Sequence, residues 1–217
     1  MVRKHPQVIS DFELNLAELP LSPSSVVLWD DVFQARRPLR VEIGVGNSPF
    51  LILVAQSSPL FNYLGFEYSR KRVLKFLKKV EQAGVTNIRI MNVNACLVLD
   101  HIFEDGGVDH FYINHPDPWP KRRHAKKRFV STQNVQRMLR LLTSGGGLSL
   151  RTDVPSYAAE MLEVLDGTEG LLNLAGKGHF AEGPIESFST PYEEKFLKEG
   201  RRIFYLEYQK KDAEPLS

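Results

Sequence analysis

The sequence predicts an α/β fold, a doubly wound and mostly parallel sheet with helices on both faces. From about residue 39, short runs rich in β-branched and aromatic residues alternate with stretches of helical periodicity, which is typical of successive βαβ units. Five such units are followed by two further strand-like runs, so we expect a seven-stranded sheet. A length of 217 residues suits one full core, and residues 1–217 are therefore predicted to form a single domain.

The first two units run from residue 39 to Gly84. We expect a strand over 39–45 and then a helix, with Ser48 as its N-cap and Pro49 in its first turn, where the missing N–H costs nothing. A second strand is expected over 61–67. The helix after it ends at Gly84, a residue suited to a left-handed C-cap. Helical spacing places four residues on its apolar face: Val73, Leu74, Leu77 and Val80.

The remaining elements continue this alternation. In chain order we expect a strand over 87–93, a short helix over 95–104, a strand over 108–114, a helix over 132–142, a strand over 145–153 and a helix from Pro155. Two last strands, in 171–176 and 202–210, are joined by a long polar loop. Residues 1–30 are expected to be an N-terminal extension that is partly disordered. Ligands of such sheets bind at the carboxyl ends of the strands, so the residues that close each strand carry the functional information.

Composition excludes several classes of protein. Cys96 is the single cysteine, which excludes a disulfide framework and a zinc site of several thiolates. The six histidines have no metal-ligand spacing, so no metal is expected. Neither a signal-length apolar stretch nor a run of ~18 apolar residues is present, so we expect a cytoplasmic protein that does not enter a membrane.

The first two strand ends indicate an adenosine cofactor. Gly44 and Gly46 follow the first strand, where glycines let the backbone approach a nucleoside closely. Glu67 closes the second strand and could accept hydrogen bonds from both ribose hydroxyls. Pro49 stands where a dinucleotide-binding fingerprint has its third glycine, which argues against a bound pyrophosphate. The alternative for Glu67 is a solvated residue just past a strand.

Two further polar residues at these strand ends have competing interpretations. Glu42 lies inside an otherwise apolar strand, and it either pairs with a neighbour such as Arg40 or receives a cationic group of a ligand. Asn94 follows the third strand, and it either contacts an adenine edge or initiates a turn.

The fourth strand is followed by the most unusual stretch of the chain, "PDPWPKRRHAKKR" from Pro116 to Arg128. The prolines around Asp117 restrict its backbone to extended geometry, which favours a preorganised acid over a simple Asp-Pro turn. Trp119 either stacks on a base or covers the edge of the core. Six cations within eight residues, beside a predicted nucleoside site, favour contacts with nucleic-acid phosphates over a merely solvated surface.

Five stretches of the chain together resemble one family. "VEIGVGN", "GFEYS", "NHPDPWPKRRHAKKR", "LRTD" and "STPYEE" occur in the order and at the spacing of the tRNA (guanine-N7-)-methyltransferase family, over roughly residues 35–210. The P-D-P-W-P-K core is the specific part of this resemblance. It implies a Rossmann-like class I methyltransferase that depends on S-adenosylmethionine. It further implies a monomer or homodimer that methylates N7 of a guanine in the tRNA variable loop, giving 7-methylguanosine.

The resemblance also assigns roles to individual residues. Asp117 matches the acid proposed as catalytic. Positions that match cofactor contacts are Glu42, Gly44, Gly46, Glu67, Asn94 and Asp117. Positions that match substrate binding are Lys121, Asp153, Thr190, Pro191, Tyr192 and Glu193. Positions that match the RNA-contacting loop are Arg123, His124, Ala125, Lys126, Lys127 and Arg128.

This chain departs from the family pattern at three of the positions that bear on binding. Asn94 stands where the family usually has aspartate, and Pro191 replaces a common lysine. His115 occupies a place that is usually aromatic or aliphatic. The glycine loop also reads N-S-P-F rather than N-G-E-F. We interpret these differences as divergence within the family.

The chemistry implied by the resemblance needs neither a metal nor a strong base, because guanine N7 carries a lone pair and no proton. The product ring is cationic, so a carboxylate aimed at it, Asp117 or Asp153, would stabilise the transition state more than the ground state. Alternative functions are methylation of an exocyclic amine in RNA, DNA or protein, and a non-catalytic RNA-binding module. A nicotinamide-dependent oxidoreductase is disfavoured by Pro49.

Overall fold

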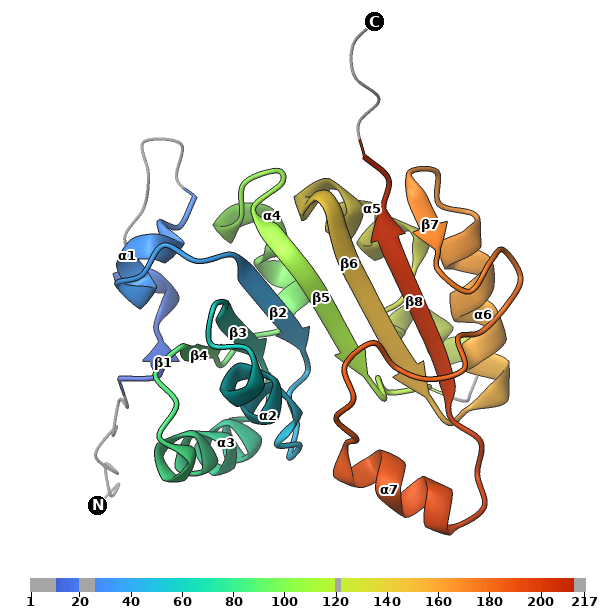
Figure 1. The fold of residues 1–217 in the computed structure, drawn as a ribbon, viewed down its shortest axis with the longest axis horizontal. Helices are drawn as coiled ribbons and strands as arrows, with labels where there is room; N and C mark the ends of the chain where they lie inside the picture. The colour runs from blue at the N-terminus through green and yellow to red at the C-terminus, as the bar shows by residue number, and fades with distance from the viewer. Residues whose placement is uncertain (1–10, 20–25, 120–121, 213–217) are drawn as a thin grey trace, which may run out of the picture.

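The computed structural model describes residues 11–19, 26–119 and 122–212. These residues form one sheet of eight strands in the order β1-β4-β3-β2-β5-β6-β8-β7 (Figure 1). The strands are β1 (Glu13–Leu14), β2 (Leu39–Ile43), β3 (Asn62–Phe66), β4 (Ile88–Met91), β5 (Val108–Asn114), β6 (Leu142–Thr152), β7 (Leu171–Asn173) and β8 (Phe204–Lys210). The helices are α1 (Trp29–Phe33), α2 (Phe50–Ser57), α3 (Arg70–Ala83), α4 (Leu99–Ile102), α5 (Thr132–Leu141), α6 (Pro155–Asp166) and α7 (Pro191–Lys198).

The predicted fold class is confirmed, and the predicted number of strands is wrong. Strands β1 to β6 pair in parallel, while β8 pairs antiparallel with both β6 and β7. The additional strand is β1, which comes from the N-terminal extension and pairs with β4 through Glu13 and Ile90. Residues 1–10 and 20–25 of that extension lie outside the described residues.

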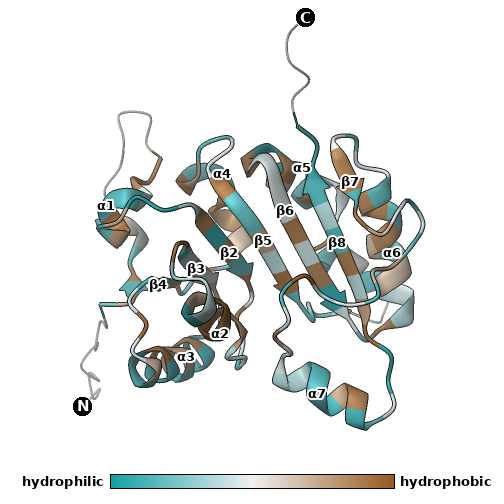
Figure 2. Ribbon diagram, viewed as in Figure 1, coloured by the Kyte–Doolittle hydropathy of each residue, from teal (hydrophilic) through white to brown (hydrophobic). Residues whose placement is uncertain are grey.

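Helices cover both faces of the sheet, and the side chains of each strand alternate between them. Phe111 and Ile113 of β5 belong to the core under α4, α5 and α6. Tyr112, between them, belongs to the second core, under α2 and α3. Figure 2 shows α2 as an almost uniformly hydrophobic helix, consistent with its burial between α3 and the sheet. The period of two along the strands thus produces the two-sided core.

A long connection from β7 to α7, residues 174–190, crosses the face of the sheet that α2 and α3 leave open (Figure 1). We refer to it as the crossing segment. Ala181 forms a β-bridge with Tyr205, and Glu186 accepts hydrogen bonds from Arg40 and from the Tyr112 hydroxyl, at 3.0 and 2.8 Å. These contacts fix the segment over β2, β5 and β8, and thereby position α7 below the sheet.

Several predicted boundaries differ from the structure. The helix expected to begin at Pro49 begins at Phe50, because Pro49 occupies the N-cap position and the Ser48 hydroxyl accepts a hydrogen bond from the Phe50 N–H. Leu74, predicted to face the core, is exposed, and Phe76 takes the buried place on α3. The short helix expected over 95–104 is a 3₁₀ turn (Ala95–Leu97) followed by α4. The long polar loop before β8 contains α7, which was not predicted.

Candidate functional site

Two adjoining cavities open at the carboxyl ends of β2, β3, β5 and β6, the edge where ligands of parallel sheets bind. The smaller has a volume of about 410 Å³ and the larger about 730 Å³, both within the range of small-molecule sites. Residues that line both cavities are Gly44, Arg72, Asn114, His115, Pro116 and Asp117. The residues predicted at the strand ends, Glu42, Gly44, Gly46, Glu67, Asn94 and Asp117, therefore all line these cavities.

The glycine loop after β2 is held in place by Glu67. Gly44 and Gly46 have φ values of +81° and +57°, the left-handed region that favours glycine. The Glu67 carboxylate accepts hydrogen bonds from the N–H groups of Gly46 and Ser69, at 3.1 and 2.8 Å. Its side chain is buried, with 3% of the residue exposed, so the interpretation of Glu67 as a solvated residue is wrong. Glu67 instead holds the glycine loop, which follows β2 and lines both cavities.

Glu42 is a completely buried acid at the floor of the smaller cavity. Its Oε1 accepts a hydrogen bond from the Asn114 amide at 2.7 Å, and its Oε2 has no hydrogen-bond partner among the described residues. Burial raises the pKa of Glu42 to about 7, although Asn114 and the charge of Arg151 act in the opposite direction. The alternative pairing with Arg40 is wrong, because Arg40 pairs with Asp109 and Glu186.

Asn94 and Asp117 both line the larger cavity. The Asn94 side chain accepts a hydrogen bond from the Cys96 N–H at 3.1 Å and caps the following 3₁₀ turn, which confirms its turn-forming role. Asp117 is exposed, lines both cavities and lies between Pro116 and Pro118. Lys121, one of the predicted substrate-binding residues, lies outside the described residues.

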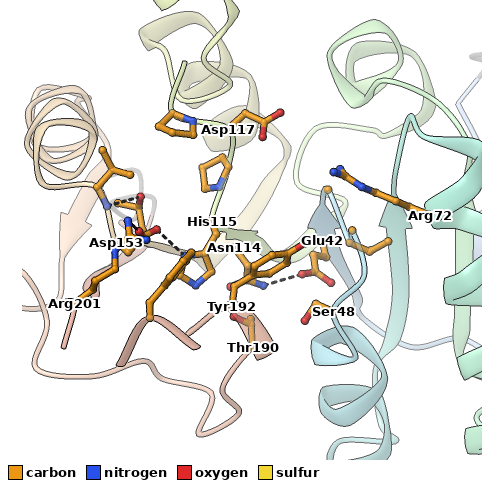
Figure 3. Close-up of a pocket in the computed structure, with 18 residues that line it drawn as sticks. Glu42, Ser48, Arg72, Asn114, His115, Asp117, Asp153, Thr190, Tyr192 and Arg201 are labelled. Atoms are coloured by element: carbon orange, nitrogen blue, oxygen red, sulfur yellow. Dashed lines mark hydrogen bonds and ion pairs between the residues drawn. The ribbon is translucent and has the colours of Figure 1, made fainter. Parts of the chain in front are cut away.

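A cluster of polar and aromatic side chains closes the far end of the smaller cavity (Figure 3). Asp153 follows β6, is buried, and forms an ion pair with Arg201. The His115 ring lies beside Asp153, with 3.6 Å between Nδ1 and Oδ1, and packs edge-on against Phe196 at 5.6 Å between centroids. Figure 3 shows this group on one side of the cleft and Arg72 entering it from the other side.

Helix α7 brings some of the predicted substrate-binding residues to the cavity and turns others away. The Thr190 hydroxyl accepts a hydrogen bond from the Glu193 N–H at 3.1 Å, and Thr190 and Glu193 together form a capping box. Pro191 lies in the first turn of the helix. Thr190 and Tyr192 line the smaller cavity, whereas Pro191 and Glu193 line neither cavity. Glu193 is buried against Arg151 at 2.7 Å and bonded by the Tyr205 hydroxyl.

The Glu193 carboxylate has an additional electrostatic role in this arrangement. Burial alone would raise the pKa of Glu193, but the hydrogen bonds from Tyr205 and Arg151 hold it below its usual value. Glu193 is therefore an ionised anchor between α7 and the strands β6 and β8, which carry Arg151 and Tyr205. Glu193 and Tyr192 are both predicted to bind substrate, but Tyr192 lines the smaller cavity and Glu193 is buried outside it.

The basic stretch after Asp117 forms a 3₁₀ segment, Arg122–Lys127, beside the larger cavity. Arg123, Lys126 and Lys127 are exposed, and the Lys127 ammonium lies 4.8 Å from the centre of the Trp119 ring. The ring of His124 packs edge-on against the same tryptophan, at 5.6 Å between centroids. Trp119 thus supports the basic segment instead of covering the core.

Arg128 differs from the other cations of the stretch. Its guanidinium donates to the Pro118 carbonyl at 2.7 Å and pairs with Glu160 of α6, and only 13% of its side chain is exposed. It therefore ties the two ends of the loop together, in contrast to the exposed cations of the segment, while it also lines the larger cavity. Ala125 belongs to the same 3₁₀ segment, but its side chain lies outside the described residues.

Several residues of the site were not predicted. Asn114 closes β5, and the rule that selected the other strand ends could have found it. Arg72, Phe196 and Arg201 line the cavities from α3, α7 and the turn before β8, and no local signal in the sequence distinguishes them from surface residues. Within residues 11–19, 26–119 and 122–212, no group of three or more His, Cys, Asp or Glu side chains could hold a metal ion. No helix in the described part of the chain is long and apolar enough to span a membrane.

Comparison with known proteins finds methyltransferases in each case. Residues 36–206 match the model of a protein family described as "Putative methyltransferase". The chain is 35% identical over 190 residues to a tRNA (guanine-N(7)-)-methyltransferase of Methylococcus capsulatus, covering 88% of this chain and 82% of that protein. It is 38% identical over 183 residues to one of Alkalilimnicola ehrlichii, covering 84% and 77%. An rRNA methylase structure from Streptococcus thermophilus has a TM-score of 0.55 at 14% identity, covering 81% of this chain and 88% of that one, which shows a shared fold.

Proposed function

This chain belongs to the tRNA (guanine-N(7)-)-methyltransferase family, and from that premise we propose that it transfers a methyl group from S-adenosylmethionine to N7 of a guanine in the tRNA variable loop. The product would be 7-methylguanosine. The single observation that carries the proposal best is Glu42, a buried carboxylate at the cavity floor with one oxygen that lacks a partner among the described residues. A buried acid of this kind is costly unless a cation binds it, and the methionine part of S-adenosylmethionine carries an ammonium group.

The rest of the cleft fits the same cofactor. The left-handed glycines allow close approach of a nucleoside to the loop after β2, and the larger cavity extends from that loop to Asn94. Glu67 faces this cavity while its carboxylate holds the Gly46 N–H, so a ribose hydroxyl would donate to an oxygen that is already oriented. We assign Glu42 to the methionine ammonium, Gly44, Gly46 and Glu67 to the ribose side, and Asn94 to the adenine side.

When bound, the cofactor supplies an electrophilic methyl group on a sulfonium, and the protein has to align the acceptor with it. Guanine N7 needs no deprotonation, so positioning and charge stabilisation are the main tasks of the side chains. Positive charge develops on the purine as N7 is methylated, and a nearby carboxylate stabilises it. Asp153 is already paired with Arg201, whereas Asp117 has no ion pair among the described residues. We therefore assign this role to Asp117.

The RNA partner would lie over the basic segment. Arg123, Lys126 and Lys127 are exposed beside the opening of the cleft, where they can contact phosphates without sequence preference. Thr190, Tyr192 and Asp153 border the smaller cavity, which would receive the guanine. The acid and the cations of the "PDPWPKRRHAKKR" stretch would thus act on the base and on the backbone of one substrate.

Transfer to tRNA is tested by incubating the purified protein with unmodified tRNA and methyl-labelled S-adenosylmethionine. We expect stoichiometric incorporation of label into the RNA and saturable cofactor binding in a separate titration. If the cofactor does not bind while tRNA does, the chain is an RNA-binding module with a decayed pocket. If the cofactor binds and no bulk tRNA accepts label, the assigned substrate is wrong.

The role of Asp117 is tested by replacing it with alanine. We expect Asp117→Ala to lower the single-turnover rate of methyl transfer by about 100-fold, since a preorganised charge at a developing cation typically contributes a few kcal/mol. Cofactor affinity is expected to change much less, because Asp117 is one of several contacts. A variant that still binds the cofactor and methylates at the wild-type rate would show that the role is wrong.

A further inference from the structure

His115 has an unusual backbone conformation for a residue with a side chain. It follows β5 directly, has a φ of +48° and donates its N–H to the Arg151 carbonyl at 2.8 Å. A non-glycine residue in the left-handed region costs about 1 kcal/mol or more, and such strain tends to be retained at functional sites. The conformation turns the imidazole into the wall shared by the two cavities.

The His115 side chain is buried without a hydrogen bond. Only 8% of the side chain is exposed, and neither Nδ1 nor Nε2 has a hydrogen-bond partner among the described residues. The nearest candidate is the Asp153 carboxylate, whose 3.6 Å distance from Nδ1 is too long for a hydrogen bond. Tyr192 and Phe196 of α7 pack around the ring, and Tyr192 is itself 39% exposed. A buried donor without a partner is costly, which indicates that a ligand supplies the partner when α7 side chains make room for it.

The imidazole stays uncharged at neutral pH. The pKa of His115 is lowered to about 4, mainly by burial and also by the nearby cations Arg151 and Arg201, against an opposing effect of Glu193. Asp153, which also faces the ring, is paired with Arg201. A neutral imidazole offers one N–H donor and one acceptor, and it adds no positive charge beside a purine that becomes cationic on methylation.

Two neighbouring side-chain donors at this end of the cleft are already engaged. The Asn114 amide bonds to Glu42, and the Arg201 guanidinium pairs with Asp153. The Asp117 and Asp153 carboxylates accept hydrogen bonds when ionised and cannot donate them. The buried His115 ring carries an N–H that is unused among the described residues, and an acceptor atom of the target base can bind it.

We propose that His115 is a specificity-determining residue whose ring N–H donates a hydrogen bond to O6 of the target guanine. On the edge of guanine that carries N7, both N7 and O6 are acceptors. N7 must remain open for the methyl group, so a donor at the boundary of the two cavities pairs with O6. Adenine presents an amine at the same place, which the N–H of His115 cannot satisfy. This inference rests on the proposed function and adds the atom by which the base is recognised.

The inference is tested with tRNA transcripts that carry either guanine or 2-aminopurine at the methylated position. 2-Aminopurine keeps N7 and the 2-amino group and lacks O6. The preference for guanine is the ratio of kcat/KM for guanine to kcat/KM for 2-aminopurine. We expect this ratio to be about tenfold larger for the wild-type protein than for His115→Phe, because loss of one buried hydrogen bond has roughly this effect. His115→Phe should lose activity on guanine and change little on 2-aminopurine. His115→Asn, which keeps a donor, should recover part of the preference.

Two controls separate recognition from folding and from the proposed function. His101→Phe replaces an exposed histidine of α4 and should leave both activities unchanged. Cofactor affinity and thermal stability of His115→Phe should match the wild type. Suppose the wild type methylates N7 of guanine. If His115→Phe then keeps the full preference for guanine, or if it loses cofactor binding, the recognition of O6 is overturned while the proposed function stands. If the wild type methylates neither transcript although it binds cofactor, the proposed function fails and the inference fails with it.

Discussion

Glu42 connects the electrostatics of a single residue to cofactor binding. Its pKa is raised to about 7 in the folded protein, mainly by burial, so the carboxyl group is partly protonated at neutral pH when the cleft is empty. A bound ammonium favours the ionised form. Binding below pH 7 therefore has to release a proton from Glu42, whereas binding above pH 7 does not.

We predict that the affinity for S-adenosylmethionine falls by up to tenfold for each pH unit below about 7 and is nearly constant from pH 7 to 8. Calorimetric titration in two buffers of different ionisation enthalpy should detect release of up to one proton at pH 6 and almost none at pH 8. The Glu42→Gln variant should bind more weakly at pH 8 and lose this pH dependence. Proton uptake on binding, instead of release, would contradict the assignment.

The same variant provides its own control for folding. Because the pKa of Glu42 is raised on folding, its contribution to the free energy of unfolding is fully present below its ordinary value of 4.5 and is lost as pH rises towards 7. Glutamine avoids the cost of a buried charge and keeps an acceptor for Asn114. Glu42→Gln should therefore unfold at or above the wild-type temperature at pH 8, so its weaker binding cannot result from a damaged fold.

Helix α7 shows how an element can position the site through its cap. Thr190 and Glu193 form the capping box, and loss of such a cap costs about 1 kcal/mol. We predict that Thr190→Ala raises the hydrogen-exchange rate of α7 amides by about fivefold and raises KM for tRNA. Thr190→Ser, which keeps the hydroxyl, should preserve slow exchange. Unchanged exchange in Thr190→Ala would show that the crossing segment alone orders the helix.

The same element explains what sequence patterns can and cannot predict. The start of α7 has a recognisable local signature, T-P-Y-E, with a capping residue, a proline at the first turn and a glutamate at the third position. The polar surroundings and the short helix, with few apolar positions at helical spacing, nevertheless favour a loop in the sequence pattern. Strand β1 has no local signature at all, since two residues form a strand only through their pairing with β4.

Positions at strand ends were predictable, but their partners were not. The sheet topology alone places Glu42, Gly44, Glu67 and Asp117 at one edge, and the structure has them there. The bond from Asn114 to Glu42 joins residues 72 positions apart, and only the packing of β5 beside β2 creates it. Likewise, nothing local distinguishes Arg128, which is tied to Glu160, from the exposed cations around it.

For the whole molecule, the distribution of charge matters more than the net charge of +2. The exposed cations of the basic segment lie beside the opening of the cleft, so they can hold RNA phosphates while the base enters. We predict that the double variant Arg123→Ala and Lys126→Ala weakens tRNA binding and reduces the slope of log affinity against log salt by about two, because each cation accounts for roughly one released counterion. Filter binding across salt concentrations measures this slope.

A matched control removes the same charge from a distant surface. Lys177→Ala combined with Lys211→Ala replaces two exposed lysines that line neither cavity, and it should leave the salt slope nearly unchanged. Cofactor affinity should be preserved in both double variants. Equal losses of tRNA affinity in the two double variants would indicate that overall charge, and not the basic segment, determines RNA binding.

The proposed reaction methylates one atom, N7 of a tRNA guanine, and chemical cleavage of the product identifies that atom. Unmodified tRNA is incubated with the purified protein and S-adenosylmethionine, and the RNA is then cleaved chemically at 7-methylguanosine. We predict a single new cleavage at a guanine of the variable loop, which is absent when either the protein or the cofactor is omitted. Methyl transfer to the RNA without any such cleavage would place the methyl group on another atom, such as an exocyclic amine, and would contradict methylation at N7.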